Sequence, residues 1–91
     1  MQIHTSVPLG RLMATPNALR HVDESDIFEG LRRHAGTDWG ELDPQDLSEN
    51  DLALKAGNRI LSAYTTGAGI RFWIITESDR SATTVLLPED Y

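Results

Sequence analysis

The segment 77–84, ESDRSATT, holds the densest group of side chains that could do chemistry. Arg80 stands among hydroxyl groups, and a guanidinium so placed can hold a carboxylate or a phosphate through charge-assisted hydrogen bonds. A simpler interpretation pairs Arg80 with Glu77 or Asp79 and lets the neighbouring serines cap a turn. The segment therefore predicts either an anion or partner contact at Arg80 and Asp79, or an ordinary polar turn.

His34 is the second candidate, because an imidazole titrates near neutral pH and can serve as a general base. With Arg80 holding a phosphate and Thr83 or Thr84 orienting it, these residues would suit RNA cleavage. That layout is similar to the barnase-like and RelE-like ribonuclease toxins. Leu31 lies three residues before His34 on a helical stripe, so a packed or capping histidine is the alternative.

Other motifs for catalysis or for a cofactor do not occur in the sequence. The chain has no cysteine, which removes disulfides, thiolate metal sites and a thiol nucleophile. Its three histidines have no metal-ligand spacing, and neither a glycine-rich phosphate loop nor a nucleophile elbow is present. We expect no metal and no cofactor.

The formal net charge is −6, and the acids are concentrated in the middle of the chain. Ten of the fourteen lie between residues 23 and 51, where only two arginines, Arg32 and Arg33, oppose them. Direct binding to a nucleic-acid backbone is therefore not expected. An acidic surface could instead meet a basic groove of a protein partner, or it could be an ordinary solvated face.

The sequence pattern predicts strands in the C-terminal half of the chain. Residues 60–64 alternate with a period of two, and 71–76 and 83–87 are rich in β-branched and aromatic residues. In 71–76, one face carries Phe72 and Ile74 and the other carries Trp73 and Ile75, so both faces are apolar. This arrangement favours a central strand.

The N-terminal half carries helix signals. Thr15-Pro16 and Asp43-Pro44 are N-cap and first-turn pairs, and glycines follow the expected helix ends at Gly36 and Gly57. These patterns predict helices over 17–22, 23–35 and 44–56. The fold expected is α+β, with two or three N-terminal helices packed on a three-stranded antiparallel C-terminal meander. A short N-terminal edge strand over 9–14 is left open.

Size and composition predict one domain covering residues 1–91, because a chain of this length forms a single small core. No segment approaches the roughly 20 apolar residues that span a bilayer. Residues 1–16 also lack a charged-then-apolar secretion signal. The expected location is the cytoplasm.

Several segments resemble a family of small uncharacterised proteins from bacterial plasmids, phages and integrated elements. They span nearly the whole chain: 14–16 (ATP) with 18–19 (AL), 34–42 (HAGTDWGEL), 49–51 (END), 59–64 (RILSAY) and 72–91 (FWIITESDRSATTVLLPEDY). Thr37 stands where the family has glycine in its tryptophan loop. Some members are labelled as restriction-modification related, although this chain is too short for a methyltransferase. The resemblance implies a bacterial or phage origin and no particular activity.

The function expected from the sequence is that of a small, non-enzymatic accessory protein that binds a protein partner. Its binding surface would be the acidic helices or the Arg80 turn. Trp73 and Arg71 share a strand face, and Trp39 stands in a loop, so all three are candidates for partner contacts or for core packing. A homodimer is also open, and the ribonuclease is the alternative function.

Overall fold

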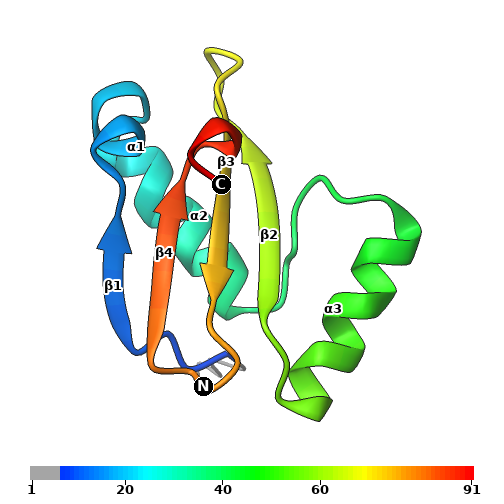
Figure 1. The fold of residues 1–91 in the computed structure, drawn as a ribbon. Coiled ribbons are helices and arrows are strands. Elements are labelled where there is room, and N and C mark those ends of the chain that lie inside the picture. Colours follow the sequence, from blue (N-terminus) through cyan, green and yellow to red (C-terminus); the bar gives the residue numbers. More distant parts are fainter. Residues whose placement is uncertain (1–6) are drawn as a thin grey trace, which may run out of the picture.

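The computed structural model describes residues 7–91, which fold around one four-stranded sheet (Figure 1). Along the sheet the strands follow the order β1-β4-β3-β2. β4 pairs parallel with β1 and antiparallel with β3, and β3 pairs antiparallel with β2. The strands are β1 (Arg11–Ala14), β2 (Ile60–Thr65), β3 (Arg71–Thr76) and β4 (Ala82–Leu86).

The predicted α+β class is confirmed, but the predicted three-stranded antiparallel sheet has one strand fewer than the sheet in the structure. The meander β2-β3-β4 is present, and β1 adds a fourth, parallel strand, so the sheet is mixed. Short polar turns predict the meander, whereas the register Arg11↔Ala82 joins opposite ends of the chain and leaves no local signal. Gly10 (φ +63°) leads into β1, and a Cβ there would lie 2.5 Å from the Arg80 carbonyl oxygen.

Three α-helices and a terminal 3-10 helix accompany the sheet. The Thr15 hydroxyl accepts a hydrogen bond from the Ala18 N–H (3.1 Å), and the Asp43 carboxylate accepts one from the Asp46 N–H (2.9 Å). Gly57, with φ +76°, ends the third helix. The helices are α1 (Pro16–His21), α2 (Glu24–Ala35), α3 (Pro44–Ala56) and η1 (Pro88–Asp90).

The helices cover the sheet unevenly. α1 and α2 pack on one face and bury Phe72, Ile74 and Val85 with their own apolar residues. α3 lies beside β2 and closes a smaller cluster around Trp39 and Ile60. Among the described residues, only η1 stands over the opposite face in Figure 1.

β3 is a central strand, as its pattern predicts, because β2 and β4 flank it. Phe72 and Ile74 point toward α1 and α2, whereas Trp73 and Ile75 lie on the face without α-helices. Trp73 is half-buried there, and its ring meets the Tyr91 ring edge-on with 5.7 Å between centroids.

Candidate functional site

His34 lies in the buried layer between α2 and the sheet, with no exposed surface. Its Nδ1 is 2.6 Å from the Ser62 Oγ on β2, and its Nε2 is 2.8 Å from the Thr76 Oγ1 on β3. The Thr76 hydroxyl is in turn 2.7 Å from that of Thr83 on β4. The chain of contacts ends at the Leu9 carbonyl, 2.7 Å from Thr83.

The carbonyl at the end of this chain fixes the direction of every hydrogen bond. The Thr83 hydroxyl donates to the Leu9 oxygen and therefore accepts from Thr76. Thr76 must then accept from the His34 Nε2–H, which leaves Nδ1 to accept from the Ser62 hydroxyl. His34 is thus assigned as the neutral Nε2–H tautomer.

Burial lowers the pKa of His34 to about 4, and the positive charge of Arg80 acts in the same direction. The ring is therefore neutral at pH 7 and has both nitrogens engaged within the protein. A general base needs contact with substrate. The buried position of His34 fits the packed-histidine interpretation and gives no path for a substrate.

Arg80 braces the β3–β4 turn against the end of α3. Its Nη1 donates to the carbonyl oxygens of Asn58 (2.7 Å) and Glu77 (3.1 Å), and its Nη2 donates to that of Ala53 (3.2 Å). Arg80 also has φ +61°, a backbone conformation uncommon for residues with a side chain. The partners are carbonyls rather than the side chains of Glu77 or Asp79.

The remaining residues of the turn do not converge on Arg80. The Asp79 carboxylate accepts from the Ser81 N–H at 2.9 Å and so caps the turn. Thr83 is fully buried and contacts the Thr76 hydroxyl, whereas Thr84 points to the opposite face of β4. The four residues of the ribonuclease interpretation therefore share no common surface.

The tryptophans and Arg71 lie in separate places. Trp39 is buried, donates from Nε1 to the Asp51 carboxylate (2.9 Å) and meets the His34 ring edge-on. Arg71 is exposed and donates to the Glu41 carbonyl at 3.1 Å. Trp73 shares the face of Arg71, but its ring meets the Tyr91 ring edge-on. These positions do not combine with the Arg80 turn into one patch.

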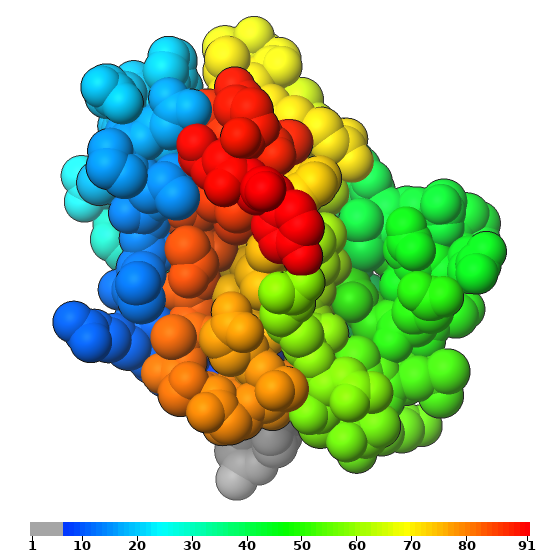
Figure 2. All heavy atoms as spheres, in the orientation of Figure 1, coloured from blue at the N-terminus to red at the C-terminus, as the bar shows by residue number. Residues whose placement is uncertain are grey.

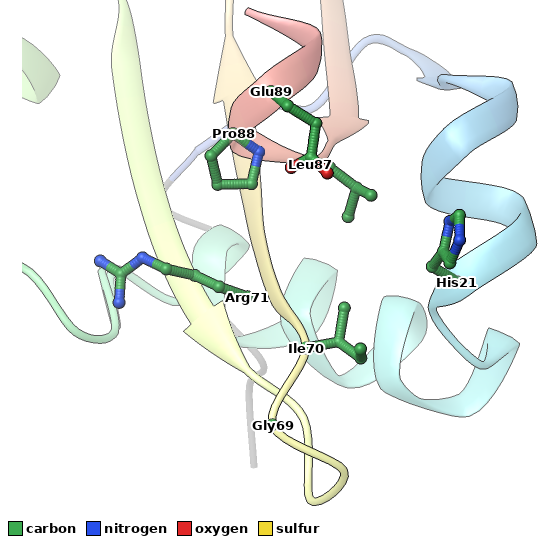
Figure 3. A pocket seen from close by; sticks show the side chains of 7 residues that line it. All are labelled: His21, Gly69, Ile70, Arg71, Leu87, Pro88 and Glu89. Atoms are coloured by element: carbon green, nitrogen blue, oxygen red, sulfur yellow. The ribbon is translucent and has the colours of Figure 1, made fainter.

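A hollow of about 280 Å³ lies between α1, the β2–β3 hairpin and η1. Figure 3 shows His21 on one side of it and Ile70 and Leu87 between, with the Arg71 side chain directed away. The His21 Nδ1 donates to the Asn17 carbonyl (2.9 Å). The hollow therefore has no converging set of polar groups.

Within residues 7–91, no three or more His, Asp or Glu side chains lie close enough together to hold a metal ion.

The edge of the sheet at β2 is closed by other segments. The Asn50 carboxamide on α3 donates to the Leu61 carbonyl (2.6 Å) and accepts from the Leu61 N–H (3.3 Å), as a neighbouring strand would. Further along, the Ala63 N–H donates to the Trp39 carbonyl (3.2 Å) and the Ala63 carbonyl accepts from the Glu41 N–H (2.7 Å). Asn50 is buried, and its carboxamide finds these partners on β2.

The edge at β1 is bare over the described residues. Leu12 and Met13 are 53% and 49% exposed, Arg11 is also exposed, and Ala14 is partly buried. Figure 2 shows β1 in blue at one margin of the molecule. An exposed strand edge is a template for another strand. The short N-terminal edge strand that the sequence allows over 9–14 is present as β1, and its exposure is the feature that the sequence does not indicate.

Another hollow, of about 340 Å³, lies between α1 and α2, and α1 directly follows β1 along the chain. Leu19 and Phe28 line it and are 63% and 59% exposed. Glu24 is its one charged lining residue. Exposed apolar side chains that gather in this way mark an interaction surface. In the sequence, Ile27 and Phe28 are two large apolar neighbours, and this pair is the signal that could have indicated the surface. In the structure Ile27 is buried and Phe28 is exposed.

Exposed acids gather near the start of α3, at Asp43, Asp46 and Glu49. Repulsion from the Asp43 carboxylate is the main cause that raises the pKa of Asp46, which shows how closely acids crowd at the start of this helix.

No helix within residues 7–91 is long and apolar enough to cross a membrane. Comparison with protein-family models, curated proteins and solved structures gives no match to the chain.

Proposed function

We propose that the protein is a small, non-enzymatic accessory protein that binds another protein. The single observation that carries the proposal is the bare β1 edge beside exposed apolar side chains, in a sheet whose other edge is closed. Apolar surface and unpaired strand groups are characteristic of interaction surfaces. A cytoplasmic role in a bacterial plasmid, phage or integrated element rests on the family resemblance alone.

The Arg80 turn has less support as the contact surface than the acidic helices. The Arg80 guanidinium already serves three carbonyls, so a partner would have to compete with them. The acids near the start of α3 are exposed and free to attract a basic partner. The acidic surface would then raise the rate of encounter, and the apolar surface would provide contact area.

A pull-down from bacterial lysate tests the proposal. Tagged protein should recover one partner in near-stoichiometric amount, and the reciprocal pull-down should recover this protein. Replacing Asp46 and Glu49 with Asn and Gln should weaken recovery at low salt. Ser48→Ala, on the same exposed helix, is the matched control. Failure to recover a partner in either direction would refute the proposal.

The ribonuclease alternative stays a prediction, and the geometry gives it no support, because His34 and Thr83 have no exposed surface. Purified protein incubated with RNA tests it directly. We expect no cleavage and no growth defect on expression. Cleavage that His34→Gln abolishes while the fold is retained would establish the alternative and overturn the non-enzymatic proposal.

A further inference from the structure

The outer edge of β1 carries backbone N–H and C=O groups in the arrangement that pairs with a further strand. The Arg11 N–H donates to the Ser81 carbonyl (3.0 Å) and the Thr15 N–H donates to the Val85 carbonyl (2.9 Å). Since strand residues alternate in direction, Met13 also faces β4, and Leu12 and Ala14 face outward. Among the described residues, no hydrogen bond uses the N–H of Leu12 or Ala14.

We infer that the β1 edge receives an extended, net-basic segment of another polypeptide, which adds to the sheet as a fifth strand. This inference rests on the proposed function. It specifies how the partner binds, by strand addition, and what charge its binding segment carries. Outward N–H and C=O groups spaced two residues apart along a strand match an extended peptide backbone. Neither a small ligand nor a helix can satisfy them in that order.

Side chains on both faces of β1 would support the added strand. Leu12 lies on the face of α1 and α2, and Met13 lies on the opposite face. An added strand would place apolar side chains beside each of them at alternate positions. A side chain at the end near α1 could enter the hollow lined by Leu19 and Phe28.

The charges of the protein favour a basic segment. Glu24 lines the hollow between α1 and α2, and together with its sequence neighbours Asp23 and Asp26 it outnumbers Arg20 of α1. The whole chain carries −6, so its field attracts a basic segment at low salt. Arg11 stands at the other end of β1, which favours an acidic or neutral residue at that end of the segment.

A second copy of this chain fits the edge less well. A stable dimer commonly buries about 800 Å² per partner, and β1 has four residues to offer. Two copies would also bring like net charges of −6 together. A flexible segment of a partner avoids both difficulties, because it can follow the strand edge into the α1–α2 hollow.

The test uses random linear peptides displayed as a library and selected on the full chain. We expect enriched peptides with alternating apolar residues and a Lys or Arg. A synthetic copy of one such peptide should bind Leu12→Pro at least about fivefold more weakly than Leu12→Ala, because only proline removes the outward N–H. Leu52→Ala, which truncates an exposed leucine on α3, should bind as the wild type does.

Amide exchange on the complex gives the second measurement. The N–H groups of Leu12 and Ala14 should gain protection when the peptide binds, and methylation of alternate peptide nitrogens should abolish binding. Equal binding by Leu12→Pro and Leu12→Ala would overturn strand addition. So would a library that yields no peptide, although a partner recovered from lysate would then still uphold the proposed function. Concentration-dependent protection at β1 without peptide would assign the edge to a second copy and overturn the inference.

Discussion

The two edge strands of the sheet, β2 and β1, both direct backbone N–H and C=O groups away from the sheet. Within residues 7–91, other segments bind these groups at β2 but not at β1. At β2, the carboxamide of Asn50 and the segment around Trp39 occupy the outward groups of Leu61 and Ala63. At β1, the outward groups of Leu12 and Ala14 have no such cover within residues 7–91. An exposed strand edge is a template for another strand, and among the described residues only the β1 edge offers one.

Removing the cover of the β2 edge should have the largest effect. Asn50→Ala leaves the part-buried Leu61 N–H and carbonyl without partners, so we expect a loss of about 3 kcal/mol in the free energy of unfolding. Urea denaturation followed by tryptophan fluorescence measures it. Ser48→Ala on the same helix is the control, expected within about 0.5 kcal/mol. An Asn50→Ala loss as small as the control's would show that Asn50 does not close this edge.

The second prediction concerns the buried chain of hydrogen bonds, which runs from Ser62 on β2 to Leu9 just before β1. His34 at its centre has its pKa lowered from 6.5 to about 4. The unfolded state therefore binds a proton first as the pH falls, and stability present above pH 6.5 is lost between there and pH 4. We expect a loss of about 2 kcal/mol between pH 7 and pH 5.

Urea denaturation at pH 7 and pH 5 checks the titration of His34. In His34→Gln the loss over this range should largely disappear, although the variant is less stable at pH 7 because glutamine cannot reproduce both imidazole contacts. An equal loss in both proteins would assign the pH dependence to other groups. His21, which is exposed, provides the matched control as His21→Gln.

The third prediction concerns the brace that holds α3, the helix that covers the β2 edge. Arg80→Ala removes the donors to the carbonyls of Ala53 and Asn58, and we expect a loss of about 1 to 2 kcal/mol. Arg80→Gly removes the same donors but suits the positive φ, so it should be the less damaging of the two. Thermal unfolding of both variants tests this order, and equal melting temperatures would contradict it.

Local signals account for most of what the sequence predicts correctly. Caps and glycines give the helix ends at Thr15, Asp43 and Gly57, and the alternation in β3 gives both its faces and its central place. What the sequence does not give depends on contacts between distant segments. The pairing of β1 with β4 and the contact of Asn50 with Leu61 arise only when the chain is folded.

The candidate site shows the same limit. Arg80 is a natural choice for a binding residue when only its polar neighbours are known, because the carbonyls it serves belong to α3 and the segment after it. His34 likewise resembles a base until its partners on β2 and β3 are visible. The sequence allows an edge strand over 9–14, but its parallel pairing with β4 and the lack of cover on its outer side within residues 7–91 depend on the finished sheet.

The smallest effect is expected at β1 itself and sharpens the contrast between the edges. Leu12 and Leu61 both direct their N–H groups outward, but within residues 7–91 only that of Leu61 has an acceptor, the Asn50 carboxamide. In free protein the Leu12 amide should exchange much faster than the Leu61 amide. Leu12→Pro should reduce the free energy of unfolding by less than about 1 kcal/mol, because it removes no bond to β4. Slow exchange at Leu12, or a loss as large as that of Asn50→Ala, would mean that the β1 edge is already paired.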